Sequence, residues 1–187
     1  MSFGTSHNDN DDEVLRAAKL FCNNDPDAFQ WLHKRFSKSI YRFCLKMLSD
    51  EDLAKDAYQE TFIKAYEHRM DFRGDNFPAW IFTIARRVCL NVIRSRRHDD
   101  VFDEILHSEG ESSDEDVYLR MHIQKAIDSL SPEFKEALVL REYEGLSYEQ
   151  IAVVLHIELS LAKVRVHRAR LIVRKLLMPV MQERYES

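Results

Sequence analysis

The stretch from Leu146 to Leu177 constrains the fold more than any other part of the chain. It predicts two helices that are joined by a very short turn at residues 156–158. The second of these helices carries six Lys or Arg residues and no acid between Leu159 and Leu177. A short scaffold helix followed by a basic helix is an arrangement with which proteins enter the DNA major groove. The sequence therefore predicts a helix-turn-helix with a basic second helix.

Local signals mark the ends of these two helices. Ser147 and Gln150 have the spacing of a capping box, in which each side chain bonds the backbone N–H of the other residue. Gly145 precedes them and suits the C-cap of a preceding helix. His156 stands in the turn, where the backbone is expected to become left-handed and where Gly is common. Histidine is one of the few other residues enriched at positive φ.

The second helix divides into faces at about 100° per residue. One apolar stripe is expected to be buried: Ala162, Val166, Ala169 and Val173. Basic residues flank the opposite face, with Lys163, Arg170 and Arg174 on one side and Arg165, Arg168 and Lys175 on the other. Between the flanks lie Ser160, Val164, His167 and Leu171. We interpret the flanks as phosphate contacts and Ser160, Val164 and His167, with Arg168, as neighbours of base edges. The alternative is a solvated basic helix.

The composition favours a helical protein. The chain of 187 residues is 45% apolar and contains only four Gly and four Pro. No window shows a continuous β pattern or a membrane-crossing run, and the N-terminus does not resemble a signal peptide. The three cysteines are isolated on apolar positions, which favours buried thiols in a reducing cytoplasm over a disulfide or a zinc site. A redox sensor is the alternative. We expect a cytoplasmic protein with no metal and no cofactor.

Charge is segregated along the chain. Residues 99–116 contain nine acids and no Lys or Arg, so the remainder is basic although the whole chain has a net charge of −5. We therefore expect an acidic flexible linker at 99–117 between two small helical domains at 13–98 and 118–187. Residues 1–12 are polar and are expected to form a disordered tail.

Helix signals recur on both sides of the linker. The spacing predicts a short helix over 14–21, a long amphipathic helix capped by Asp25 or Asp27, and a helix over 51–68 that starts at Ser49. A further helix has Pro78 in its first turn and runs to about residue 97. After the linker, one helix covers 119–130, and Ser131 caps another that starts with Pro132. The fold class is all-α, and the C-terminal domain has four helices.

Aromatic and arginine residues interleave between Phe72 and Arg97. The aromatic residues Phe72, Phe77, Trp80 and Phe82 offer stacking surfaces. The arginines Arg73, Arg86, Arg87, Arg94, Arg96 and Arg97 offer phosphate contacts. This chemistry suits the holding of unstacked bases along a charged track. The alternatives are that the aromatic rings belong to the core and that Arg86 and Arg87 pair with acids of residues 50–56.

A third element lies between Asp56 and Tyr66. Asp56, Gln59, Glu60 and Lys64 share a polar face beside an apolar one. By itself such a face is more often solvated than functional.

Taken together and in this order, the three elements resemble the extracytoplasmic-function (ECF) sigma factors of bacterial RNA polymerase. The resemblance rests on D-x-x-Q-E-x-F from Asp56, on F-R-G with W and I-A-R from Phe72, and on H-R-A-R from His167. It covers about residues 28–97 and 119–177. It implies a subunit that binds core polymerase and directs promoter recognition, DNA melting and transcription initiation, with no catalysis of its own.

The resemblance also implies roles for individual residues. Residues implied to dock on the clamp helices of the β′ subunit are Asp56, Gln59, Glu60, Phe62 and Lys64. Residues implied to bind and open the minus-ten element are Phe72, Arg73, Asp75, Asn76, Phe77, Trp80, Arg86, Arg87, Asn91, Arg94, Arg96 and Arg97. Residues implied to read the minus-thirty-five element are Ser147, Ser160, Leu161, Lys163, Val164, Arg165, His167, Arg168, Arg170 and Arg174. Further implied partners are the β flap and an anti-sigma factor, with no small-molecule substrate and no direct membrane insertion.

Two other classes of function were weighed. A free-standing transcription regulator would bind DNA tightly by itself, but it leaves the aromatic and arginine block of residues 72–97 unexplained. An enzyme is disfavoured because the sequence has no H-E-x-x-H motif, no Gly-rich phosphate loop and no Cys/His cluster.

Overall fold

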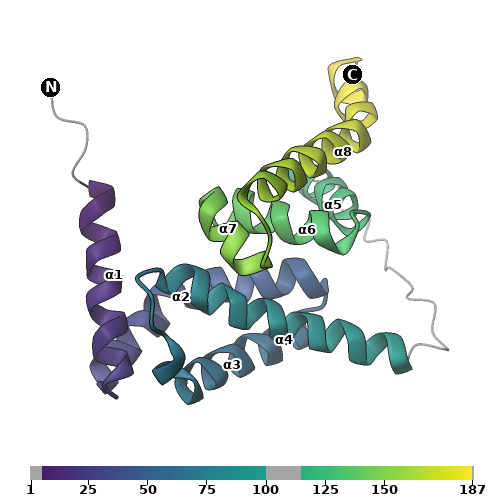
Figure 1. The fold of residues 1–187 in the computed structure, drawn as a ribbon. Helices are drawn as coiled ribbons and strands as arrows, with labels where there is room; N and C mark the ends of the chain where they lie inside the picture. Colours follow the sequence, from purple (N-terminus) through teal and green to yellow (C-terminus); the bar gives the residue numbers. More distant parts are fainter. Residues whose placement is uncertain (1–5, 100–114, 187) are drawn as a thin grey trace, which may run out of the picture. The chain divides into compact units, whose positions relative to one another are not determined.

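The described part of the chain is helical throughout its regular structure. The computed structural model describes residues 6–99 and 115–186, and the side chains of residues 11–96 and 118–182. Within these ranges there is no strand, which confirms the all-α fold class. None of the described helices combines the length and apolar character that a membrane crossing needs. The chain divides into two compact units, with the main boundary after Ile93, and Figure 1 shows the helices of each. The predicted linker lies almost wholly outside the described residues.

Four α-helices form the first unit. They are α1 (Ser6–Cys22), α2 (Pro26–Leu48), α3 (Glu51–Glu67) and α4 (Phe77–Asp99), with a 3-10 turn, η1 (Arg69–Asp71), before α4. The long helix α2 packs against both α1 and α3. Its buried side chains recur at spacings of three and four, as the sequence predicts: Leu32, Phe36, Ile40, Phe43 and Met47. The rings of Phe43 and Phe82 then join α2 to α4, with centroids 5.5 Å apart.

Helix α1 is longer than the sequence predicts. It begins at Ser6, within the expected tail, rather than near Val14. Val14, Ala18 and Phe21 are buried and lie on one face at spacings of four and three. The preceding turns are rich in acids, which suit the positive end of the helix dipole.

The junction between α2 and α3 differs by one residue from the prediction. Ser49 does not start α3; it is the left-handed C-cap of α2, with φ of 54°, and its N–H donates to the carbonyl of Leu45. Asp50 is the N-cap of α3, and its carboxylate accepts from the N–H of Leu53 at 3.0 Å. At the start of α2, Asp25 rather than Asp27 is the cap and accepts from Ala28 at 2.9 Å.

Four α-helices and one π-helix, counted over the described residues, form most of the second unit. They are α5 (Glu115–Asp128), α6 (Pro132–Leu138), the π-helix η2 (Val139–Tyr143), α7 (Tyr148–Leu155) and α8 (Leu159–Glu186). Helix α8 packs on α5 and α6. Ser131 precedes Pro132 as predicted, but its side chain makes no capping bond, and its carbonyl accepts from Phe134 and Lys135 instead. Periodicity did not predict the π-helix.

Helix α8 extends beyond the predicted end near Leu177. It continues through Pro179 to Glu186, although a proline removes one backbone donor from a helix interior. Several apolar side chains of this extension are exposed, among them Leu176, Met178 and Met181.

Candidate nucleic-acid interface

The predicted helix-turn-helix is formed by α7 and α8. The capping box is complete: the N–H of Gln150 donates to Ser147 Oγ at 3.1 Å, and the N–H of Ser147 donates to Gln150 Oε1 at 2.8 Å. Gly145, just before it, has a left-handed φ of 70°. His156 has a φ of 54° and ends α7 in the predicted turn. Each local signal that defined the motif is therefore confirmed.

The faces of α8 lie where helical periodicity placed them. Ala162, Val166 and Ala169 are fully buried, which confirms the apolar stripe; Val173 is half-buried. Residues of the opposite face are exposed, namely Ser160, Leu161, Val164, His167 and Leu171. This face joins three apolar side chains, a hydroxyl and an imidazole, which are groups able to contact base edges. Ser147 lies apart from it at the start of α7, where its hydroxyl belongs to the capping box.

Two of the six basic residues between Leu159 and Leu177 are ion-paired within the second unit. Arg170 donates from Nε and Nη2 to Glu142 Oε1 at 2.8 and 2.5 Å. Arg165, with a side chain only 19% exposed, lies 3.6 Å from the carboxylate of Glu133. Arg165 and Arg170, one from each flank, are therefore each paired with an acid in this structure, and those acids come from α6 and η2 rather than from α8 itself. Elsewhere on α8, no described carboxylate lies within ion-pair distance of Lys163, Arg168, Arg174 or Lys175.

The aromatic residues just before α4 and in its first turns serve mainly as core. Phe72, Phe77 and Phe82 are 8%, 1% and 2% exposed, so the expectation that they offer stacking surfaces is corrected. The ring of Phe77 packs against those of Phe72 and Phe36, with centroids 5.6 and 5.4 Å apart. Trp80 is half-buried and packs on Phe72 and Phe77. Trp80 is thus the ring of this block that keeps a partly exposed surface.

Asn76 also has a structural task. Its side-chain oxygen accepts from the N–H of Ala79 at 3.1 Å, and it therefore acts as the N-cap of α4. Arg73, Asp75 and Arg94 are exposed around this helix, whereas Arg86 and Arg96 are half-buried. The side chain of Arg97 lies outside the described side chains.

A pocket of about 280 Å³ lies between the end of α3 and α4. Its lining combines two cations, an imidazole, a carboxylate, an amide, an aromatic ring and two aliphatic side chains: Lys64, His68, Asp71, Trp80, Ile84, Arg87, Val88 and Asn91. At its rim, His68 Nδ1 and Asp71 Oδ2 are 3.0 Å apart. Arg87 therefore lines a pocket, and no described acid of residues 50–56 pairs with it. An aromatic face beside donors and acceptors is suited to an unstacked base.

The polar face of α3 is present, whereas Phe62, also implied as a docking residue by the resemblance, lies elsewhere. Asp56 and Gln59 are exposed, and Glu60 pairs with Lys64 at 2.8 Å. The hydrogen bond to Glu60 raises the pKa of Lys64. Phe62 is not on this face. It is 6% exposed, and its ring packs on His33 and Tyr58 with centroids 4.5 and 5.3 Å away.

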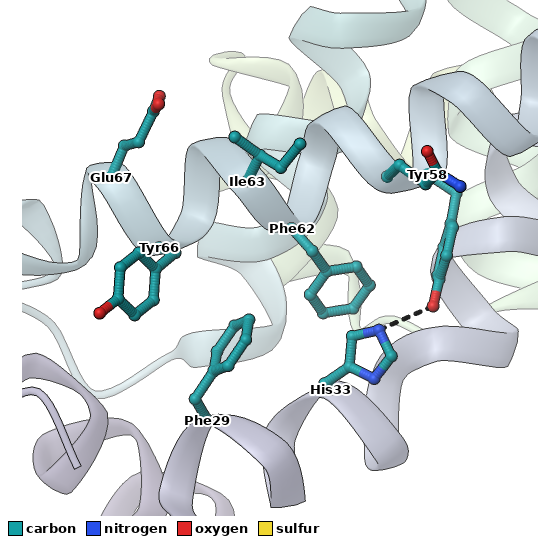
Figure 2. Close-up of a pocket in the computed structure, with 8 residues that line it drawn as sticks. Phe29, His33, Tyr58, Phe62, Ile63, Tyr66 and Glu67 are labelled. Atoms are coloured by element: carbon teal, nitrogen blue, oxygen red, sulfur yellow. Dashed lines mark hydrogen bonds between the residues drawn. The ribbon is translucent and has the colours of Figure 1, made fainter. Parts of the chain in front are cut away.

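An apolar groove between α2 and α3 was not predicted from the sequence. It has a volume of about 620 Å³ and is lined by Phe29, His33, Tyr58, Gln59, Phe62, Ile63, Tyr66 and Glu67. Figure 2 shows these side chains and the 2.8 Å hydrogen bond between Tyr58 Oη and His33 Nε2. Ile63 and Tyr66 are 54% and 42% exposed. Two large apolar side chains three residues apart, next to the polar face of α3, were the sequence signal for this groove.

The described side chains do not form a metal site. No group of three or more His, Cys, Asp or Glu residues among them is arranged to hold an ion.

Comparison with known proteins assigns both units to one family. Family models for Sigma-70 region 2 and for Sigma-70, region 4 match residues 32–98 and 120–172. The RNA polymerase sigma-H factor of Pseudomonas aeruginosa is 34% identical over 175 residues, covering 85% of this chain and 91% of that protein. The ECF RNA polymerase sigma factor SigW of Bacillus subtilis is 30% identical over 178 residues, covering 87% and 95%.

A solved structure agrees with these relatives. The sigma factor RpoE, determined in complex with the anti-sigma factor NepR from Bartonella quintana, matches with a TM-score of 0.67 and 30% identity. The match covers 80% of this chain and 96% of that one. Two helical units with these matches define a promoter-recognition subunit of bacterial RNA polymerase.

The chain belongs to the ECF sigma factors. It is an alternative sigma factor that directs promoter-specific transcription initiation, and it binds RNA polymerase and promoter DNA. It is not an enzyme.

Proposed function

We propose a division of tasks between three surfaces: the exposed edge of α3 docks on core polymerase, the α3–α4 pocket captures a promoter base, and α8 reads the minus-thirty-five element. The orientation of the helices carries this proposal. Helix α3 turns Phe62 into the core and Asp56 and Gln59 to the solvent. Helix α8 likewise buries its alanine-rich stripe and exposes the opposite face.

The docking surface consists of Asp56, Gln59, Glu60 and Lys64, and its partner is the clamp helices of the β′ subunit. Acidic and amide groups at successive turns of α3 favour a partner helix with basic and amide side chains. Phe62 contributes indirectly, because its burial against His33 fixes which edge of α3 faces outward.

A second polymerase contact is proposed for the C-terminal unit. A hollow of about 390 Å³ there is lined by the apolar side chains of Ile123, Ile127, Leu138 and Val173, together with Tyr143 and the charged side chains of Glu142, Arg170 and Arg174. An apolar hollow of this kind suits the insertion of large apolar side chains from a helix. We assign it to the β flap.

The α3–α4 pocket is the proposed site for an unstacked base of the minus-ten element. The exposed part of Trp80 offers a stacking surface, and Arg87 and Asn91 offer polar contacts. One base–aromatic stack contributes about 1–3 kcal/mol, which offsets part of the energy of unstacking the duplex. Arg73 and Arg94 are exposed and are proposed to follow the phosphates of the displaced strand.

Helix α8 is proposed to lie in the major groove of the minus-thirty-five element. Ser160, Val164 and His167 face base edges, and the apolar side chain of Val164 suits a thymine methyl group. Lys163, Arg168 and Arg174 are exposed and lie on either side of that face, where phosphates border the groove.

An anti-sigma factor is proposed as a regulatory partner. The matching RpoE was solved with the anti-sigma factor NepR. In this chain, the apolar groove between α2 and α3 has the volume and lining to receive the apolar side of a partner helix, with Ile63 and Tyr66 as its exposed walls. The groove shares Gln59 with the proposed docking surface, so an inhibitor seated there would compete with polymerase.

The division of tasks is tested by promoter selection in vitro. Core polymerase with the wild-type chain is allowed to select templates from a random library, and the selected minus-ten and minus-thirty-five sequences are read. We expect Val164→Ala to change selection only in the upstream element and Asn91→Ala only in the downstream element. Gln30→Ala, at an exposed position of α2 outside these surfaces, is the control. Unchanged selection with both variants would contradict the proposal.

A further inference from the structure

We infer that Glu142 and Arg170 form a positioning pair for the recognition helix α8, and that Arg170 does not contact DNA phosphates. This inference rests on the proposed role of α8 in reading the minus-thirty-five element. It reassigns a residue that the sequence placed on a phosphate-gripping flank, and it gives a role in promoter recognition to Glu142, an acid outside the helix-turn-helix.

In this pair, two donors of one guanidinium share one carboxylate oxygen. Nε and Nη2 of Arg170 both donate to one oxygen of Glu142, Oε1, at 2.8 and 2.5 Å. The two residues are 28 positions apart in sequence, and their side chains are 47% and 41% exposed. Two donors on one acceptor fix the plane of the guanidinium as well as its distance. The contact therefore restrains the middle of α8 against η2.

A neighbouring contact ties the start of α7 to the same segment. The guanidinium of Arg141, next to Glu142 in sequence, lies 4.7 Å from the ring centroid of Tyr148, the first residue of α7. Arg141 also donates to the carbonyl of Leu146 at 2.7 Å. Hydrogen bonds to Glu142 and then to Tyr148 raise the pKa of Arg170. Consecutive residues of η2 thus hold both helices of the helix-turn-helix.

The π-helix explains why Glu142 reaches α8. In η2 the N–H of Glu144 bonds the carbonyl of Val139, five residues earlier. A π turn holds more residues than an α turn, so it changes the direction of the side chains within and after it. Single π turns inside helices are frequent at functional sites. Here Glu142 lies within the π turn and pairs with Arg170 of α8, and the turn precedes the helix-turn-helix.

The charge balance argues against a phosphate contact at Arg170. A carboxylate held at hydrogen-bond distance compensates the guanidinium and would itself repel a phosphate placed beside it. Lys163, Arg168, Arg174 and Lys175 have no described acid within ion-pair distance and are better placed to supply phosphate contacts. Half-exposed ion pairs contribute little to stability, so the role of this pair is expected in DNA binding rather than in folding.

The change in DNA affinity caused by Glu142→Gln has opposite signs for the two possible roles of Arg170, positioning of α8 and contact with a phosphate. The probe is a promoter duplex selected from a random library by core polymerase with the wild-type chain. The affinity of core polymerase carrying each variant for this duplex is then measured over a range of salt concentrations. A positioning pair predicts that Glu142→Gln weakens binding about three- to tenfold, with an unchanged slope of log affinity against log salt. If Arg170 were a phosphate contact restrained by Glu142, the same change would strengthen binding and steepen the slope by about 0.9.

A charge swap provides the second measurement. Arg170→Ala alone should weaken binding with no change in slope, and the swap of Glu142→Arg with Arg170→Glu should recover most of the lost affinity. A swap that binds as weakly as Arg170→Ala or more weakly, or an Arg170→Ala variant that loses slope or binds normally, would overturn the inference. If the wild-type holoenzyme selects no duplex at all, the proposed role of α8 in reading the minus-thirty-five element is wrong. If it selects a duplex but the variants behave otherwise than predicted, only the positioning pair is wrong.

Discussion

The ring of Phe62 on α3 meets the imidazole of His33 on α2 at a steep angle, with centroids 4.5 Å apart. This contact fixes which edge of α3 is presented to the solvent. Phe62→Ala should therefore act through folding, because it removes a side chain that is only 6% exposed. We expect it to lower the free energy of unfolding by about 3–5 kcal/mol in urea denaturation. Ile63→Ala, the exposed neighbour, should stay within about 0.5 kcal/mol of wild type. Similar losses for the two variants would contradict the assignment.

The capping box at the start of α7 should contribute measurably to the second unit. Ser147→Ala removes the acceptor for the N–H of Gln150. We expect it to lower the stability of this unit by about 1 kcal/mol, the usual effect of losing a side-chain N-cap. Denaturation followed by circular dichroism is the measurement. Ser160→Ala, an exposed serine of α8, is the matched control and should leave stability unchanged.

Trp80→Ala should separate promoter opening from promoter binding. Trp80 is the half-buried ring of the pocket beside Arg87 and Asn91, so its loss removes a stacking surface that matters only after a base leaves the duplex. We expect the yield of heparin-resistant open complexes to fall about tenfold, the effect of losing roughly 1.4 kcal/mol of stacking, with little change in duplex binding. Trp31→Ala, a half-buried tryptophan of α2 outside the pocket, is the control. Equal loss of both activities would argue against base capture.

Arg168→Ala should behave as the removal of a phosphate contact. No described acid pairs with Arg168, and its side chain is exposed beside the residues of α8 that we propose to face base edges. We expect weaker binding to the minus-thirty-five duplex and a slope of log affinity against log salt reduced by about 0.9. Titration at several salt concentrations measures both quantities. Arg16→Ala on α1 is the matched control, and an unchanged slope for Arg168→Ala would contradict the groove assignment.

The Cys22 thiol should react slowly with disulfide reagents at neutral pH. Burial raises the pKa of the Cys22 thiol above its ordinary value, and the thiol donates to the carbonyl of Arg69 at 3.1 Å. The folded-state pKa lies above that of the unfolded chain. The contribution of this thiol to the free energy of unfolding is therefore fully present at low pH, and it is lost as pH rises through the folded-state pKa. We expect slower reaction with a disulfide reagent at pH 7.5 than in the urea-unfolded chain. A faster reaction in the folded state would instead support the redox-sensor alternative.

The helix-turn-helix could be predicted from the sequence because its signals are local. The capping box of Ser147 and Gln150, the left-handed Gly145 and His156, and the buried stripe of α8 each depend on neighbours within one or two helical turns. The predicted start of α3 was displaced by one residue, from Ser49 to Asp50. Ser49 and Asp50 are both good capping residues, and the sequence alone did not show that Ser49 would adopt the left-handed C-cap conformation of α2.

Contacts between distant segments could not be predicted from periodicity. Glu142 and Arg170 are 28 residues apart, and a single helical wheel of α8 does not contain the acid. The burial of Phe72 and Phe77 likewise depends on rings from α2, α4 and the loop between α3 and α4. Aromatic residues next to arginines have the same composition whether they stack on bases or fill a core, so composition alone left both interpretations open.

Co-elution with bacterial core RNA polymerase on a sizing column tests the docking surface most directly. The wild-type chain is compared with an Asp56→Ala, Gln59→Ala, Glu60→Ala triple variant and with a control triple variant at Asp11, Asp12 and Glu13, which are exposed on α1. We predict that wild type and control form a stable complex with core polymerase and that the α3 variant, folded by circular dichroism, does not. A complex with all three chains, or with none, would contradict the proposed docking surface on α3.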